Sequence, residues 1–376
     1  MAQLFQSIRA FGRWAFLPFG VISGRREVAS PILPDGDYGF RAPSLRSGPG
    51  RTKPSRRLRT LAGLGFALAF LGAPGAHAAD TILAGSVDAA SASLWPVYIG
   101  QKNGYFDAVD LKLDVIFSQS NASAIQQLAA GSLNIAPSAG LVDPIRAIEK
   151  GAPLAIVRIL LQAPPYALLA KPAIKRIADL KGRTIIIGGA KDITRIFAER
   201  MLAANGVKPG EYDVVFAGAT SARYSALQAG AVDAAMLTVP FNFYGELAGF
   251  TNLGFTFDTL PDMPFAGMAV NRVWAAANPK IVDRFLAAVG KGVAWFEDVS
   301  HREEAIKLMV SHSKTRQEDI ERSYDFLRSK RLFEPTGKVS RNKIGAVVEA
   351  LRELGDVPAD FQVDRLFLPG VTQVID

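Results

Sequence analysis

Short polar side chains collect just after the apolar runs of this sequence, where they are suited to hold the oxygens of an anion. Hydroxyl and amide groups donate hydrogen bonds to a carboxylate or sulfonate, and a lysine adds a counter-charge. The candidate ligand-binding residues in these segments are Ser91, Ser120, Asn121, Ser138, Ala139, Lys191, Asp192, Thr194 and Thr238. Together they favour a small organic anion over a sugar or a metal ion as the ligand.

Helix capping is an alternative role for some of these side chains. Ser123 and Gln126 fit a capping box, so we expect Ser123 to cap the following helix and leave Ser120 and Asn121 as ligand contacts. Ser138 fits an ordinary N-cap equally well.

The segment GGAKDIT (188–194) combines a cap with an anion-binding turn. Its glycines let backbone N–H groups approach an anion at the start of a helix from residue 192, where the helix dipole favours negative charge. Asp192 fits the N-cap of this helix. We expect Arg195 and Arg223, which lie within helical stretches, to be solvated surface residues.

Aromatic residues are frequent in the same loops. Trp95 and Phe241 are candidate contacts for an apolar part of a ligand, with Phe243 and Tyr244 close by in sequence. Packing in the core is the alternative for each of them.

The sequence offers little for catalysis. There is no cysteine, and His301 and His312 are the only histidines after residue 78, so nucleophile–base pairs and thiolate metal sites lack their usual parts. The cluster HREE (301–304) fits a solvated helix face. No Walker-type phosphate loop, zinc spacing or aromatic-basic nucleic-acid pattern is present. We therefore expect no enzymatic activity, no cofactor, no metal and no nucleic-acid partner.

Alternation of short apolar runs with longer helical stretches predicts an α/β protein with mainly parallel strands. The predicted strands are 81–87, 111–118, 133–139, 154–161, 167–171, 184–189, 212–218, 232–238 and 267–272. The predicted helices are 92–103, 123–130, 140–150, 192–205, 221–229, 240–248, 279–299, 302–313, 316–328 and 340–354. The candidate polar residues then follow strand ends, where open α/β sheets bind ligands.

Two stretches resemble each other about 100 residues apart. QLAAGSLNIAPSA (127–139) and ALQAGAVDAAMLT (226–238) both run from a helix end through a glycine into a strand. Gly131 and Gly230 would supply the left-handed conformation just past each helix. The repetition predicts two lobes of similar architecture.

Six motifs occur in the order seen in periplasmic substrate-binding proteins of ABC importers. They are KNGYF (102–106), LAAG (128–131), KGAPL (150–154), ADLKGRTIIIGG (178–189), LQAGAVDAAMLTVP (227–240) and NPKIVDRFLAA (278–288). The chain from 80 to 370 resembles the group that includes nitrate, alkanesulfonate, taurine and thiamine-pyrimidine binders. DLKG and ALQAG with VDAA are the most specific part of the likeness.

The resemblance implies a type II periplasmic binding protein fold, with two α/β lobes, two crossing strands and a helical C-terminal region. Lobe 1 would comprise 79–166 and 267–376, and lobe 2 would comprise 167–266, with crossings near 164–168 and 263–268. Tyr166 and Phe265 lie near these hinges. A monomer would hold its ligand between the lobes, close on it, and pass it to an ABC permease in the inner membrane.

The formal charge of +8 comes entirely from the N-terminal part of the chain. Residues 1–78 hold 11 of the 43 basic and 3 of the 35 acidic residues, which leaves 32 of each in 79–376. The remaining chain is charge-balanced, so the high pI does not point to a nucleic acid or an anionic membrane as partner.

Residues 51–78 have the layout of a cleavable signal peptide. Basic residues in 51–59 precede an apolar run at 60–73 and the small-residue site AHA at 76–78. The run is too short to cross a bilayer, which needs about 20 residues, and the absence of cysteine excludes a lipid anchor. We expect cleavage after Ala78 and a soluble periplasmic protein. Residues 1–50 are then a start assigned too far upstream or a disordered extension.

Two alternatives stay open. The same two-lobed module serves in other proteins as a ligand sensor for a signalling partner. The resemblance also includes binders of a thiamine pyrimidine precursor, whose ligand is not a simple organic anion.

Overall fold

The computed structural model describes residues 79–313 and 315–376. The predicted extension (1–50) and signal peptide (51–78) lie outside these residues. All described residues belong to one compact unit. Within them, no helix has the length and apolar character that crossing a membrane requires.

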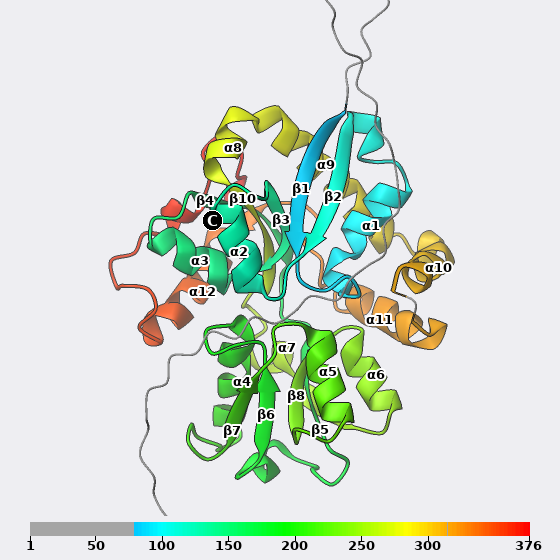
Figure 1. Ribbon diagram of the computed structural model, residues 1–376, viewed down its shortest axis with the longest axis vertical. Coiled ribbons are helices and arrows are strands. Elements are labelled where there is room, and N and C mark those ends of the chain that lie inside the picture. The colour runs from blue at the N-terminus through cyan, green and yellow to red at the C-terminus, as the bar shows by residue number, and fades with distance from the viewer. Residues whose placement is uncertain (1–78, 314) are drawn as a thin grey trace, which may run out of the picture. The chain divides into compact units, whose positions relative to one another are not determined.

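Two five-stranded sheets organise the described chain (Figure 1). The sheet of lobe 1 has the order β2-β1-β3-β10-β4, with β1 Asp80–Ser86, β2 Leu111–Phe117, β3 Ile135–Gly140, β4 Leu154–Leu161 and β10 Ala266–Asn271. The sheet of lobe 2 has the order β7-β6-β8-β5-β9, with β5 Tyr166–Ala170, β6 Thr184–Ile187, β7 Asp213–Phe216, β8 Ala234–Thr238 and β9 Thr251–Phe255. The chain crosses between lobes at 162–165 and again before β10.

Helices flank both sheets. Lobe 1 carries α1 Trp95–Lys102, α2 Asn121–Ala129, α3 Val142–Glu149, α8 Arg272–Ala277, α9 Pro279–Glu297, α10 Arg302–Ser313, α11 Gln317–Ser329 and α12 Arg341–Glu353. Lobe 2 carries α4 Ile193–Ala204, α5 Thr220–Gln228, α6 Phe241–Leu247 and α7 Thr256–Thr259. A two-stranded pair, β11 Val339–Ser340 and β12 Val374–Ile375, lies near the C-terminus. The predicted strands and helices are all present, and β9, β11, β12, α7 and α8 were not predicted.

The prediction of mainly parallel strands needs one correction, and it is the same in both lobes. In lobe 1, β1 pairs in parallel with β2 and β3, but β10 runs antiparallel to β3 and β4. In lobe 2, β6 pairs in parallel with β7 and β8, but β5 runs antiparallel to β8 and β9. Both antiparallel strands are the first to follow a crossing between lobes. The chain enters each new sheet from the junction and so runs against the other four strands.

The repeated helix-to-strand unit is confirmed. Helices α2 and α5 each end one residue before a C-cap alanine, and Gly131 and Gly230 follow with φ of 78° and 73°. A β-carbon at either position would meet no atom within 4 Å, so the backbone conformation, rather than crowding, favours glycine there.

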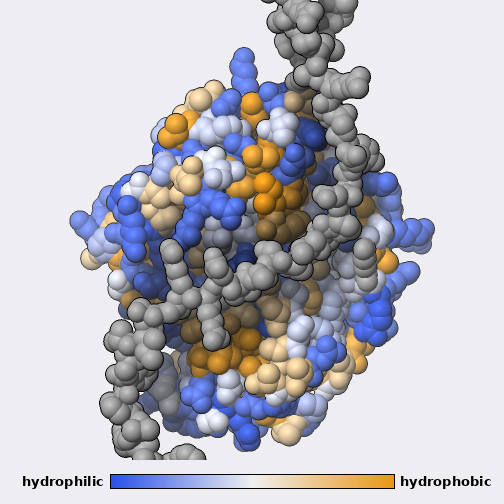
Figure 2. Space-filling model, viewed as in Figure 1, coloured by the Kyte–Doolittle hydropathy of each residue, from blue (hydrophilic) through white to orange (hydrophobic). Residues whose placement is uncertain are grey.

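Edge strands differ in how they are covered. Phe117 of β2 and Phe216 of β7 are 46% and 53% exposed, and Figure 2 shows apolar surface near β1 and β2 in lobe 1 and near β6 and β7 in lobe 2. Strand β4 is also at a sheet edge, yet all eight of its residues are buried. The C-terminal region covers it, with a bridge from Leu161 to Phe333.

Helices α1 and α9 approach so closely at Gly292 that we expect alanine there to be destabilising. Its β-carbon would lie 2.1 Å from the carbonyl oxygen of Pro96, so Gly292→Ala should lower the free energy of unfolding by about 1–3 kcal/mol. Gly345 in α12 has open space around it, and Gly345→Ala should instead raise that free energy by about 0.5–1 kcal/mol through helix propensity. Urea unfolding of both variants measures the difference, and equal effects would contradict the close approach.

Candidate ligand cleft between the lobes

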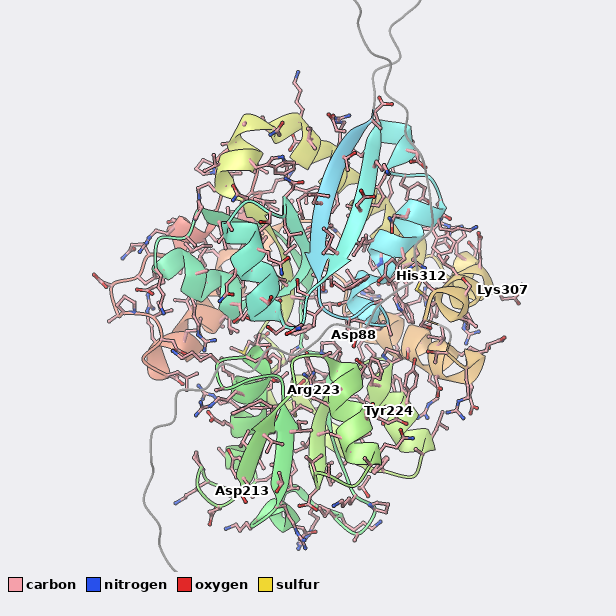
Figure 3. The ribbon with its side chains drawn as sticks, viewed as in Figure 1. Asp88, Asp213, Arg223, Tyr224, Lys307 and His312 are labelled. Carbon is pink, nitrogen blue, oxygen red and sulfur yellow. The ribbon has the colours of Figure 1, made fainter. Side chains whose placement is uncertain are left out.

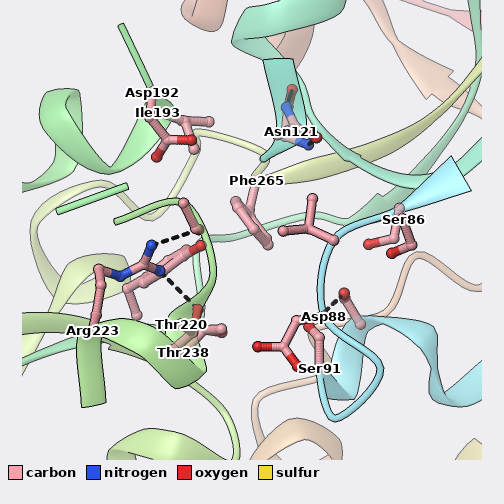
Figure 4. A pocket seen from close by; sticks show the side chains of 16 residues that line it. Ser86, Asp88, Ser91, Asn121, Asp192, Ile193, Thr220, Arg223, Thr238 and Phe265 are labelled. Atoms are coloured by element: carbon pink, nitrogen blue, oxygen red, sulfur yellow. Dashed lines mark hydrogen bonds between the residues drawn. The ribbon is translucent and has the colours of Figure 1, made fainter. Parts of the chain in front are cut away.

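A cavity lies where the two lobes meet, at the carboxyl ends of strands from both sheets (Figure 4). It encloses about 580 Å³ including its open mouth. Lobe 1 and the returning crossing contribute Ser86, Val87, Asp88, Ser91, Ser93, Asn121, Ser138, Gly140 and Phe265. Lobe 2 contributes Tyr166, Asp192, Ile193, Gly218, Thr220, Arg223 and Thr238.

Arg223 of α5 is the basic residue among those lining the cavity, and it is only 1% exposed. The prediction that it is a solvated surface residue is therefore wrong. Its side chain lies across the first turn of α5, where Nε donates to the carbonyl of Met236 and Nη1 donates to the carbonyls of Ala217 and Gly218, each at 2.8 Å. Nη2 donates to Thr220 Oγ1 at 2.7 Å.

The guanidinium of Arg223 has five N–H groups, and four of them make the hydrogen bonds above. A side-chain hydrogen bond also links this guanidinium to the hydroxyl of Tyr166. No carboxylate of the described residues forms an ion pair with Arg223. Tyr166 lies beside it, with the guanidinium carbon 6.0 Å from the ring centroid. Burial raises the pKa of Tyr166, so its hydroxyl stays protonated and able to donate.

Two carboxylates face the same cavity from opposite lobes. Asp88 of lobe 1 accepts hydrogen bonds from the backbone N–H groups of Ala90 and, across the junction, Ser221. Asp192 caps α4 as predicted, and its Oδ1 accepts from the N–H of Thr194 at 2.9 Å and from the hydroxyl of the same residue at 2.5 Å. Figure 3 shows Asp88 and Arg223 on the two sides of the junction. The cavity thus presents acceptors as well as a cation.

The structure brings five of the predicted site residues into the cavity wall. They are Ser91, Asn121, Ser138, Asp192 and Thr238. The amide of Asn121 is already engaged, because Nδ2 donates to the carbonyl of Gly140 and to Asp143 Oδ2, and Oδ1 accepts from the N–H of Gly140. Asn121 therefore shapes the wall and holds α2 against the start of α3.

Three other predicted polar residues lie outside the wall. Ser120, not Ser123, is the N-cap of α2, with its hydroxyl accepting from the N–H of Ser123, so the predicted capping box was misplaced by three residues. Lys191 is exposed and pairs with Asp356 at 3.3 Å. Thr194 is fully buried, and its hydroxyl accepts from the N–H of Gly188. These groups support the loops that carry the cavity.

The predicted aromatic contacts also lie outside the wall. Trp95 is 2% exposed and packs against Phe296 in the core of lobe 1. Phe241 is buried in lobe 2 against Tyr244, with ring centroids 5.2 Å apart. Ala139 is buried in β3 opposite Gly267. Tyr166 and Phe265, named only as hinge neighbours, are the aromatic residues of the wall, and their rings meet edge to face at 5.1 Å.

Several wall residues were not singled out from the sequence. Ser86 ends β1 and Asp88 follows it, while Gly218 and Thr220 follow β7, so the rule that ligands bind at and beyond strand ends would have found them. Arg223 has no such signal, since it is one arginine within a polar helical stretch.

Comparison with known proteins agrees with this architecture. The family model described as NMT1/THI5 like matches residues 91–301. The chain belongs to the NMT1/THI5-like family. A search of curated proteins found no match.

Solved structures share the fold of this family member at low sequence identity. The alkanesulfonate-binding protein SsuA from Xanthomonas axonopodis pv. citri, bound to MOPS, is 18% identical, with a TM-score of 0.64 over 78% of this chain and 98% of that one. The periplasmic nitrate-binding protein NrtA from Synechocystis PCC 6803 is 16% identical, with a TM-score of 0.62 over 75% and 83%. A zinc-bound ligand binding component of an ABC-type import system from Staphylococcus aureus is 13% identical, with a TM-score of 0.66 over 78% and 97%. The predicted periplasmic binding protein fold is confirmed.

The lobes of this NMT1/THI5-like protein touch on both sides of the cavity. On one side Arg146 and Lys191 share Asp356, which joins α3 and the end of α12 to the loop before α4. On the other side, in α6, the hydroxyl of Tyr244 donates to Thr315 at 2.7 Å. These contacts join the two lobes on either side of the cavity.

Asp143, behind Asn121, should make stability depend on pH. Burial raises the pKa of Asp143 most, and the negative charge of Asp192 raises it further. The hydrogen bond from Asn121 and the charge of Arg146 lower it in part, and the resulting pKa is about 7. The folded protein then holds a proton that the unfolded chain releases near pH 4, so this group's contribution to stability falls as pH rises from about 4 to about 7. Asp143→Asn should match the wild type near pH 4 and exceed it in stability above pH 7.

Urea unfolding at several pH values measures this effect as the difference in free energy of unfolding between Asp143→Asn and the wild type. Asp143→Asn keeps an oxygen that can accept from Asn121. A difference that does not grow between about pH 4 and about pH 7 would contradict the raised pKa.

Proposed function

We propose that this protein is an extracytoplasmic solute-binding protein that captures a small organic anion of the sulfonate or carboxylate type between its lobes. It then delivers the ligand to an ABC permease in the inner membrane. The observation that supports this proposal is the buried guanidinium of Arg223, which lines a cavity ringed by hydroxyl groups and makes no ion pair with a described carboxylate. Solved proteins of the same fold include alkanesulfonate-binding and nitrate-binding proteins.

The carboxylates of the cavity restrict the class of ligand further. Asp88 and Asp192 would repel a plain dianion, but they would accept hydrogen bonds from an amino group. We infer a ligand that carries its acidic group at one end, toward Arg223, and an N–H donor toward Asp88 or Asp192. An aminosulfonate or amino acid fits this pattern better than nitrate does.

An aminopyrimidine precursor of thiamine is the second candidate. The observation in its favour is the same pair of carboxylates together with Tyr166 and Phe265, which offer acceptors and ring faces to a flat heterocycle with an amino group. Such a ligand would not need a negative charge.

The placement of the histidines supports a non-catalytic role. His301 stacks on Trp295 with ring centroids 4.5 Å apart, and the ring of His312 packs at a tilt against Tyr98 at 3.8 Å. Both belong to the helical part of lobe 1, and neither lines the cavity; Figure 3 shows His312 on the lobe 1 side of the junction. This supports binding without chemistry.

Export is part of the proposal. We infer that residues 51–78 are a signal peptide that is cleaved after Ala78 and that the mature protein is a soluble periplasmic monomer. Strand β1 begins at Asp80, so this cleavage would leave every described strand and helix intact. N-terminal sequencing of the protein from the periplasm should begin at Ala79.

A thermal-shift screen of the mature protein (79–376) tests the ligand class. The panel contains taurine, alkanesulfonates, aliphatic and aromatic carboxylates, nitrate, an aminopyrimidine and neutral sugars. We expect an aminosulfonate or amino acid to give the largest rise in melting temperature, because a ligand stabilises the state that binds it. Stabilisation by sugars alone would contradict an anionic ligand, and stabilisation by the aminopyrimidine alone would favour the second candidate.

A further inference from the structure

A second cavity lies within lobe 1 and shares no lining residue with the cleft. It encloses about 1280 Å³ including its open mouth. Its walls come from β4, from the outer side of α9, from the loop at 335–337 and from the C-terminal segment at 370–373. Arg158 of β4 lines it.

Arg158 is buried with most of its donors unused. Its residue is 3% exposed, and its one hydrogen bond to a described residue runs from Nη2 to the carbonyl of Glu334 at 3.0 Å. Nε is buried and has no partner. A guanidinium has five N–H groups, so four remain without an acceptor among the described residues.

The carboxylate of Glu334 makes its hydrogen bonds to other groups than Arg158. The Glu334 side chain accepts from the N–H and the hydroxyl of Thr336, at 3.0 and 2.7 Å, and from the N–H of Gly337. No ion pair joins it to the guanidinium within the described part of the chain. Burial lowers the pKa of Arg158, and the charge of Glu334 opposes this shift. The cation is thus held in place with an incomplete set of partners.

Two glycines leave the guanidinium open to the cavity. A β-carbon on Gly337, whose φ is +80°, would lie 2.5 Å from Nη1, and one on Gly290 of α9 would lie 3.6 Å from it. Larger residues at these positions would occupy the space beside Nη1. The apolar side chains of Leu286, Ala287 and Val371 line the same cavity.

We propose that this cavity is a second binding site, which takes a small organic monocarboxylate with its carboxylate on Arg158 and its apolar body against Leu286, Ala287 and Val371. Planar guanidinium and carboxylate groups match each other in a two-bond geometry. The exposed Asp283 at the rim disfavours ligands with several negative charges. The site is independent of the cleft and of the ligand proposed for it.

Titration with sodium benzoate tests the site, followed through the ¹H–¹⁵N signal of the Arg158 Nε–H group. Arg158→Lys assigns this signal by removing it. Benzyl alcohol, which has the same ring without the charge, is the control ligand. We expect benzoate to shift the signal saturably and benzyl alcohol to leave it in place.

Ala287 provides a matched pair of variants, because it is exposed on α9 and lines the cavity. Ala287→Glu should weaken benzoate binding by about tenfold or more through like-charge repulsion, and Ala287→Lys should preserve or tighten it. A signal that does not move, that moves equally with benzyl alcohol, or that responds to benzoate equally in both variants would overturn the proposal.

Discussion

Replacing Arg223 by methionine should lower the free energy of unfolding by about 3 kcal/mol or more, because buried acceptors lose their donor. The carbonyls of Ala217, Gly218 and Met236 and the hydroxyl of Thr220 all accept from this one guanidinium. Methionine fills a similar volume but donates nothing. Urea unfolding of the mature protein measures the loss.

Arg195→Met is the matched control. Arg195 is an exposed helix residue whose ion pair is with Glu199 at 2.7 Å, and exposed pairs contribute roughly 0.2–1 kcal/mol. If the two variants lose the same stability, Arg223 does not hold the cavity together. Arg223→Lys should lose less stability than Arg223→Met and more than Arg195→Met, because an ammonium has fewer donors than the four acceptors require.

Replacing Gly218 by alanine should weaken ligand binding while the free protein keeps its stability. A β-carbon there would lie 2.7 Å from the carbonyl oxygen of Gln119 and 3.0 Å from the β-carbon of Ser120, both in the opposite lobe. Overpacking of this kind costs about 1–3 kcal/mol, and the open state avoids it. We therefore expect affinity to fall roughly five- to hundredfold.

Gly189→Ala is the control for this substitution. Gly189 is in another loop of lobe 2, and the nearest atoms to its β-carbon would be those of Asp192, at ordinary contact distance. Small-angle scattering with ligand should show compaction for the wild type and Gly189→Ala, and less compaction for Gly218→Ala. Full compaction and unchanged affinity in Gly218→Ala would contradict closure at this contact.

The sequence predicted most of the fold because its periodic signals are local. Apolar runs marked β4 to the residue, and the glycines at 131 and 230 marked two helix ends. The direction of β5 and β10 was not predictable in this way, since it depends on which side of the sheet the chain enters. Strand β9 was missed because Gly254 and the polar residues Thr251 and Asn252 weaken its pattern.

The residues of the site were harder to predict, because the burial of each side chain depends on the whole fold. Trp95 and Arg223 differ from their predicted roles for one reason, which is that the rest of the fold buries both. Trp95 packs in the core of lobe 1, and Arg223 lies against backbone carbonyls of β8 and of the loop after β7. Ser120 and Thr194 were predicted as ligand contacts, but they lie at the starts of α2 and α4, where their hydroxyl groups accept hydrogen bonds from backbone N–H groups. Contacts across lobes, such as Gly218 with Gln119, have no local signal.

A crystal structure of the mature protein with the most stabilising ligand of the screen will show where this ligand binds. We expect it between the lobes, with its acidic group on Arg223 and a donor group on Asp88 or Asp192. A ligand bound elsewhere, or one held in the cleft without contact to Arg223, would contradict this expectation.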